Sequence, residues 1–105
     1  MKHEKEADIQ RGCLDLLRLK GYFCMKINTT GIYVKARDTY IKNPNVGCAD
    51  ILAFKKDKPN LAVEVKTKKG VQSDSQVGWQ KEWERSGGVY VLARSLDDVL
   101  KVIHS

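Results

Sequence analysis

Two carboxylates and a lysine fall close together in the pattern of a short β-hairpin. Asp50 opens one apolar segment, Glu64 and Lys66 end the next, and residues 57–60 between them have strong turn chemistry. If the turn centres on positions 57 and 58, opposed residue numbers add up to about 115, which places Asp50 across from Val65 and diagonal to Glu64. Facing or diagonal partners lie roughly 5–8 Å apart. The pattern therefore predicts two neighbouring carboxylates on one hairpin.

This arrangement suits a divalent cation, because two carboxylates so close repel each other unless positive charge lies between them. Mg²⁺ and Mn²⁺ prefer one or two carboxylates together with waters and phosphate oxygens. Lys66 lies two residues after Glu64 and so on the same strand face, where a cation can stabilise charge developing on a phosphate. Two carboxylates, a metal ion and a lysine together are what phosphodiester hydrolysis requires. The alternative is an ordinary ion pair between Glu64 and Lys66 on an exposed strand.

Two helix residues extend this candidate site. Glu6 precedes Ile9 and Cys13 by three and seven residues, so it shares the inward stripe of the first predicted helix. It points either into a polar pocket or into solvent, since acids are favoured at helix starts in any case. Gln76 lies on one helix face with Gln80 and two tryptophans, and it also fits the capping box that begins at residue 73. We interpret the tryptophans as core residues.

The predicted elements alternate helix and strand, which indicates an α/β layer arrangement with a mixed sheet and helices on its faces. Residues 1–105 are expected to form one domain. The expected elements are a helix over 4–20 ended by Gly21, a strand over 22–28, strands over 50–54 and 61–66, a helix over 73–85, a strand over 89–93 and a helix from 95. Residues 29–46 are expected to form an exposed ribbon or loop, with strand-like pieces at 32–34 and 39–41 and a loop at 43–45.

Composition and charge argue against a membrane or secreted protein and favour one that binds a polyanion. The chain has 105 residues, 42% of them hydrophobic, and contains neither a membrane-spanning run nor a secretory signal, so a cytoplasmic location is expected. The three cysteines form no CxxC pair, which argues against a zinc site and favours small buried hydrophobes. The net charge of +6 and the pI of about 9.3 favour a polyanionic partner. Candidate contacts to DNA are Lys68, Lys69, Lys55 and Gln80.

The succession of these motifs resembles a known family. Glu6 to Gln10, Gly47-Cys48-Ala49-Asp50, Glu64-Val65-Lys66, Gln76 to Gln80 and Gly87 to Val91 follow the order and spacing of the virus-type replication-repair (VRR-NUC) nuclease domain. That domain belongs to the PD-(D/E)xK superfamily, whose fold is a restriction-endonuclease-like core. Ala49 replaces the proline of the superfamily's name, as is usual in this branch. The resemblance spans nearly the whole chain.

The resemblance implies a role for each matching residue. Asp50, Glu64 and the backbone carbonyl of Val65 would bind Mg²⁺ or Mn²⁺, and Lys66 would be the catalytic lysine. Glu6 would be an auxiliary acid, and Gln76 would support the site and the phosphate. Family members include stand-alone phage proteins and act on branched DNA. The expected activity is therefore a metal-dependent DNA endonuclease similar to Holliday-junction resolvases, which cut four-way junctions as homodimers.

Other readings of the sequence remain open at this point. A duplex endonuclease, sequence-specific or non-specific, is one alternative, and for sequence readout only residues 29–46 offer a recognition element. A non-catalytic DNA-binding module is another, although a binding surface gains nothing from adjacent acids near phosphates. A purely structural protein would leave the inward Glu6 and Gln76 without explanation.

Overall fold

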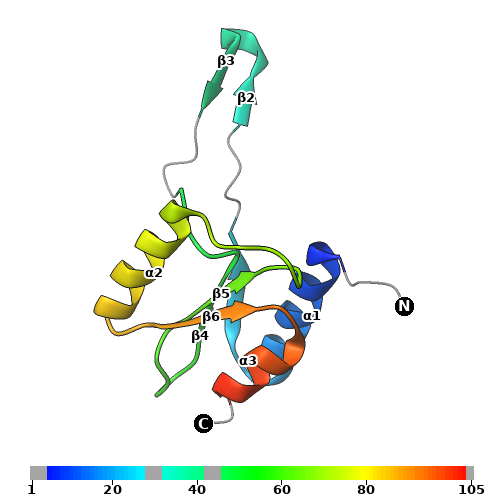
Figure 1. Cartoon of the computed structure of the whole chain (residues 1–105), viewed down its shortest axis with the longest axis vertical. Coiled ribbons are helices and arrows are strands. Elements are labelled where there is room, and N and C mark those ends of the chain that lie inside the picture. Colours follow the sequence, from blue (N-terminus) through cyan, green and yellow to red (C-terminus); the bar gives the residue numbers. More distant parts are fainter. Residues whose placement is uncertain (1–4, 28–31, 42–45, 104–105) are drawn as a thin grey trace.

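The computed structural model describes residues 5–27, 32–41 and 46–103. Figure 1 shows a sheet flanked by helices, with a two-stranded extension at one end. The elements in chain order are α1 (Glu6–Leu19), β1 (Phe23–Lys26), β2 (Ile32–Val34), the 3-10 turn η1 (Lys35–Arg37), β3 (Thr39–Ile41), β4 (Ile51–Phe54), β5 (Leu61–Val65), α2 (Asp74–Arg85), β6 (Val89–Ala93) and α3 (Leu96–Ile103).

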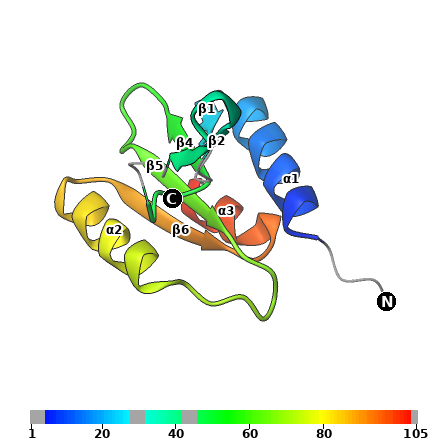
Figure 2. The same cartoon turned by 90° about the horizontal axis from the view of Figure 1, so that it is seen from above.

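The main sheet has four strands in the order β1-β4-β5-β6. The pairs β1–β4 and β4–β5 are antiparallel, whereas β5 and β6 are parallel and joined by α2, as a parallel pair requires a crossover. Helices α1 and α3 pack together on one face of the sheet, and α2 packs on the other face over β6 (Figure 2). The predicted mixed sheet flanked by helices is confirmed.

The core lies between the sheet and the α1–α3 layer. Ile9, Cys13 and Leu17 recur at helical spacing along α1, and all three are buried. The strands supply alternate residues to the same core, such as Ile51 of β4 and Val63 of β5, because successive strand side chains point to opposite faces. This alternation leaves Glu64 on the other face, the one that carries α2.

The register of the β4–β5 hairpin differs by one residue from the prediction. Ile51 pairs with Val63, so continuing the ladder places Asp50 opposite Glu64 and not opposite Val65. The reason is that Ala53 pairs with Leu61, so the last pair encloses residues 54–60, which centre on Asp57, a residue in a left-handed conformation with φ 64°. The predicted hairpin is thus confirmed, with its two carboxylates closer in register than expected.

Residues 32–41 form a separate two-stranded ribbon, which we call the arm. β2 pairs antiparallel with β3, and the turn η1 joins them. The predicted strand pieces at 32–34 and 39–41 are confirmed, while the loop predicted at 43–45 lies outside the described residues. The arm projects from the end of the body at which α2 begins, along the longest dimension of the molecule (Figure 1).

The cysteines match their predicted role as small apolar residues. Cys13 and Cys48 are buried, Cys24 is half-buried, and no disulfide forms. Burial raises the pKa of Cys13 to about 11, so its thiol stays protonated and unreactive. Separately, none of the helices in the described ranges is long and apolar enough to cross a membrane.

Candidate active site

Asp50 and Glu64 meet at the end of the β4–β5 hairpin. Asp50 lies just before β4, and its Oδ2 accepts a hydrogen bond of 2.8 Å from the backbone N–H of Val65. This bond fixes the Asp50 carboxylate beside the end of β5, beyond the last residue pair of the β4–β5 ladder. The charge of Asp50 acts on Glu64 and raises the pKa of its carboxyl. The two carboxyl groups are therefore direct neighbours, as the sequence predicted.

Glu64 is buried with only 1% of its surface exposed, although it carries an ionisable group. One oxygen, Oε2, accepts a hydrogen bond of 3.1 Å from Gln76 Nε2 and lies 4.0 Å from Lys66 Nζ. The other, Oε1, is buried and has no hydrogen-bond partner among the described residues. A buried acceptor without a partner costs about 1–3 kcal/mol, so the site holds a polar atom whose partner the chain does not supply.

The surroundings of Glu64 favour its neutral form when no cation is bound. Burial, which has the largest effect, and the nearby charge of Asp50 together raise the pKa of this carboxyl to about 8. Lys66 opposes the shift, but its ammonium does not compensate for the two other effects. A pair of carboxylates arranged in this way is stable as two anions only with added positive charge.

Glu6 occupies a different position from the one expected. It is the first residue of α1 and is exposed, so of the two alternatives the solvent-facing one holds, and Glu6 is not part of the buried stripe. The apolar stripe of α1 begins one turn later at Ile9. The charge of Glu6 nevertheless contributes to the raised pKa of Glu64, which places its carboxylate at the rim of the same site.

The start of α2 brings Gln76 to Glu64. Ser73 caps the helix, since its side chain accepts from the Gln76 N–H at 3.2 Å while Gln76 Oε1 accepts from the Ser73 N–H at 2.9 Å. This is the predicted capping box. The box uses the oxygen of the Gln76 amide and leaves the nitrogen to donate to Glu64. The Gln76 side chain thus caps the start of α2 and also orients the Glu64 carboxylate.

Gly47 allows the Asp50 segment to approach α2. Its φ of 87° lies in the left-handed region, and a Cβ at this position would overlap the Ser75 carbonyl in the first turn of α2. A side chain here would push the helix start, and with it Gln76, away from Glu64. In the sequence, Gly47 stands out only as part of the motif Gly47-Cys48-Ala49-Asp50, and local pattern does not reveal its approach to α2.

Arg94 fixes the loop that follows Lys66. Its Nη1 donates to three carbonyl oxygens of this loop, those of Thr67 at 2.6 Å, Lys68 at 3.2 Å and Gly70 at 2.7 Å. The loop is held against the end of β6, while the Lys68 side chain is exposed. Sequence reasoning missed Arg94, because nothing in the local pattern links it to a loop more than twenty residues earlier.

The candidate DNA contacts lie in three different places. Lys68 and Lys69 are exposed on the loop next to Lys66. Lys55 lies at the opposite end of β4 from Asp50, where its ammonium donates to the Lys20 carbonyl at 2.7 Å. The structure therefore brings the first two to the site but not Lys55.

A polar network beneath α2 contains Gln80, the remaining candidate. Gln72 Nε2 donates to Gln80 Oε1 and to the Tyr90 hydroxyl, both at 3.0 Å. Burial and the charge of Glu64 raise the pKa of Tyr90 to about 12, so this hydroxyl borders the site and keeps its proton. Trp79 stacks on Trp83 and lies against Tyr90. Both tryptophans are half-buried and lie outside the core cluster, so the prediction that they are core residues is not confirmed.

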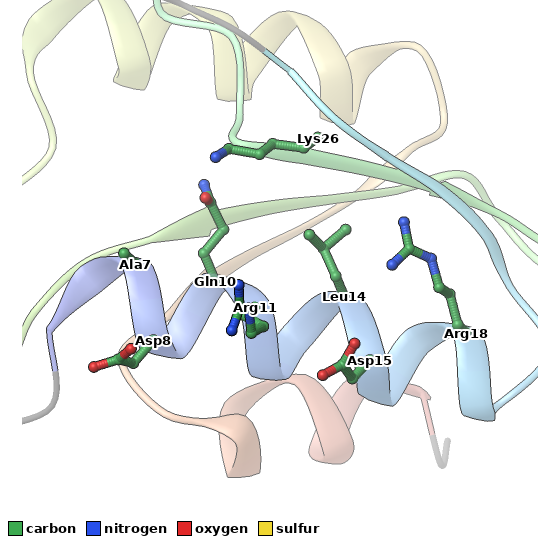
Figure 3. Close-up of a pocket in the computed structure, with 8 residues that line it drawn as sticks. All are labelled: Ala7, Asp8, Gln10, Arg11, Leu14, Asp15, Arg18 and Lys26. Atoms are coloured by element: carbon green, nitrogen blue, oxygen red, sulfur yellow. The ribbon is translucent and has the colours of Figure 1, made fainter.

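A groove of about 630 Å³ runs along the outer side of α1. Figure 3 shows Gln10, Leu14 and Arg18 pointing from the helix toward the side on which Lys26 lies. Its lining includes Asp8 as well as these residues, but neither Asp50 nor Glu64. The groove is thus separate from the pair of site carboxylates.

The residues of the site fit a divalent cation. The described parts of the chain contain no group of three or more acidic, histidine or cysteine side chains able to hold a metal. A site of two carboxylates, completed by a backbone carbonyl and waters, nevertheless matches the oxygen ligands of Mg²⁺ and Mn²⁺. The unpartnered Oε1 of buried Glu64 is the observation that such a cation would explain.

The fold has a counterpart among solved structures. The chain is similar to a structure titled "VRR_NUC domain", with a TM-score of 0.67, 20% sequence identity and coverage of 94% of either chain. At this identity the likeness concerns the fold, and the chain has the fold of a VRR-NUC domain. This agrees with the resemblance seen in the sequence. No model of a protein family matches the chain, and no curated protein matches its sequence.

Proposed function

We propose that this protein is a Mg²⁺- or Mn²⁺-dependent DNA endonuclease. The observation that carries the proposal is the buried Glu64, opposite Asp50 and with one oxygen lacking a partner, on the fold of a VRR-NUC domain. A non-catalytic DNA-binding module would gain nothing from two acids at a surface that meets phosphates. The positive net charge of +6 suits a nucleic-acid substrate.

Each residue of the site has a role in this proposal. Asp50, Glu64 and the backbone carbonyl of Val65 hold the cation, which when bound neutralises phosphate charge and makes a water more acidic. The Val65 N–H orients Asp50, and the Gln76 amide orients Glu64.

Lys66 acts on the substrate side of the carboxylates. Its ammonium lies on the face of Glu64 and provides positive charge for the phosphate oxygens as the bond to the leaving oxygen breaks. Glu6, at the rim, accepts a proton from a water or holds that water in place. Lys68, Lys69 and Gln80 contact the DNA beside the cleaved bond.

The experiment is cleavage of labelled DNA by the purified protein and by three variants, Asp50→Ala, Glu64→Ala and Lys66→Ala. We expect loss of cleavage by a factor of about 10² or more in each, with the fold retained in circular dichroism and thermal melting. Cleavage should stop in EDTA and return with Mn²⁺. Lys56→Ala, in the turn at the far end of β4, is the matched control. Full activity of any site variant, or activity in excess EDTA, would refute the proposal.

We also propose that the substrate is branched DNA, in particular a four-way junction, and that a homodimer cuts it. The reaction would take place in the cytoplasm of a bacterial cell, where a phage protein would meet such DNA. A two-fold dimer suits a symmetric junction because it presents two sites to two strands. Cleavage mapping on a mobile junction, a flap and a plain duplex distinguishes this activity from that of a sequence-specific or non-specific duplex endonuclease. Equal rates on all three DNAs would contradict the junction preference.

A further inference from the structure

The arm, residues 32–41, has too few contacts with the rest of the chain to explain why it holds its position. β2 and β3 pair with each other, and among the described elements neither has an extensive contact with the helices or the main sheet. A two-stranded ribbon is marginally stable by itself in water. An arm held away from the body in this way (Figure 1) points to a partner outside the chain.

The arm is attached directly at the candidate active site. It is inserted between β1, which ends at Lys26, and β4, which begins one residue after Asp50. The last described residue before the arm, Ile27, donates its N–H to the Asp50 carbonyl at 2.7 Å. Any molecule that reaches Asp50 and Glu64 from this end of the sheet therefore also comes close to Ile27, after which the chain leads into the arm.

The tip of the arm is basic. Lys35 and Arg37 are both exposed on the turn η1, and Asp38 follows them with φ 48°. Two cations and one carboxylate at a projecting tip favour a polyanion over a second copy of the chain, since two identical tips would repel each other across a two-fold axis. A two-stranded ribbon also has the width that the major groove of DNA admits.

We propose that the arm docks on duplex DNA next to the cleavage site, with Lys35 and Arg37 contacting phosphates. This inference rests on the proposed endonuclease function and assigns to the arm the part of the substrate that flanks the cut. The arm supplies affinity and orientation, while the chemistry remains with Asp50, Glu64 and Lys66. Cleavage at saturating DNA is therefore independent of the two tip residues.

The test is the salt dependence of DNA binding by the double variant Lys35→Ala/Arg37→Ala. Binding of a labelled duplex and of a four-way junction is measured by fluorescence anisotropy in EDTA, so that no cleavage occurs. Each lost phosphate contact lowers the slope of log K against log salt by about 0.9, so we expect a total decrease of nearly 2 and a weakening of roughly tenfold or more at low salt. The matched control is Lys56→Ala/Lys58→Ala, which removes the same charge from the exposed turn after β4.

A second variant keeps the proposal testable if the double variant misfolds at the tip of the arm. Replacing residues 32–41 with a short Gly-Ser linker removes the arm entirely, and melting confirms that the sheet remains. It should bind DNA as weakly as the double variant and keep the rate of cleavage at saturating substrate.

The possible outcomes separate the two proposals. If the wild type binds and cleaves DNA but both arm variants behave like the control, the arm inference fails and the endonuclease proposal stands. If the wild type neither binds nor cleaves any of the DNAs, both fail. A change of oligomeric state in the arm variants without a change in salt slope would show that the arm contacts a second copy, and would overturn the inference.

Discussion

The proposed chemistry depends on one buried carboxyl. Glu64 lies in the sheet with its charge opposed by burial and by Asp50, and with one oxygen lacking a partner. Taken alone, this arrangement destabilises the folded chain at neutral pH. In the proposed function, a bound divalent cation would convert this unfavourable charge into a ligand.

The raised pKa of Glu64 predicts a dependence of stability on pH. The ordinary value is 4.5 and the folded value about 8, so between these limits the folded state binds more protons than the unfolded state. The contribution to stability is thus full below about pH 4.5 and decreases as the pH rises toward 8, by up to about 1.4 kcal/mol per pH unit. In EDTA, we expect the free energy of unfolding of the wild type to fall with pH more steeply than that of Glu64→Gln.

Cation binding should act in the opposite sense. Mn²⁺ competes with the proton on Glu64, so it should raise the melting temperature more at about pH 8 than at about pH 5. Denaturant melts of both proteins across this range, with EDTA or with Mn²⁺, provide the measurement. Parallel pH profiles for the wild type and Glu64→Gln would contradict the assignment of this group.

A second prediction concerns Arg94 and the loop that follows Lys66. Arg94→Ala leaves the carbonyls of Thr67, Lys68 and Gly70 without their donor, and bonds to a charged donor contribute about 1.5–3 kcal/mol each at most. We expect a loss of about 1–3 kcal/mol in stability and faster amide exchange at 68–71. Arg85→Ala is the control, because this arginine forms only an exposed pair with Glu82. Unchanged exchange in the loop would show that Arg94 does not hold it.

At the scale of elements, the site depends on the contact between the start of α2 and the segment before β4. The capping box orients Gln76, and Gly47 lets the chain pass beside Ser75. The two segments are almost thirty residues apart, and neither contains a charged pair that would attract the other. Close approach of the backbones is what unites them.

Substitution of Gly47 should separate the two segments. Gly47→Ala combines a left-handed φ with an overlap against the Ser75 carbonyl, so we expect a loss of about 2 kcal/mol or more in stability and reduced cleavage as Gln76 moves from Glu64. Gly87→Ala is the matched control: its φ of 94° is similar, but a Cβ there meets no atom within 4 Å. It should cost about 1 kcal/mol and leave cleavage unchanged. Thermal melts and initial rates compare the two, and equal losses would exclude a role for close approach.

The molecule as a whole leaves part of its sheet uncovered. Cys24 faces α1, so its neighbours Phe23 and Met25 point to the opposite face, where α2 covers only the β6 side. Phe23 is 67% exposed at the edge strand β1, beside Phe54 of β4. This apolar surface next to an open strand edge is a candidate interface for the proposed homodimer.

Phe23→Lys should therefore weaken self-association. We expect the wild type to sediment as a dimer at micromolar concentration and the variant to shift toward monomer, because a charge would be buried in the contact. Val71→Lys, at an even more exposed apolar residue on the loop before α2, serves as the control. A wild type that stays monomeric throughout the concentration range would contradict the dimer, and an unchanged Phe23→Lys dimer would place the interface elsewhere.

Local sequence patterns were sufficient to predict most of the helices and strands and the main residues of the candidate site. Helical periodicity predicted α1, the capping box predicted the start of α2, and turn chemistry predicted the β4–β5 hairpin that carries Asp50 and Glu64. These features depend on residues close together in the chain, so local pattern is sufficient to find them. The strand pieces of the arm were found in the same way.

How distant segments meet could not be predicted from the local sequence pattern. The β4–β5 turn is centred on Asp57, so Asp50 lies opposite Glu64, while Glu6 is exposed and Lys55 is distant from the site. The role of Arg94 and the approach of Gly47 to α2 also depend on contacts between separate parts of the chain. Such contacts are set by packing and by single backbone angles, which leave no periodic signal in the sequence.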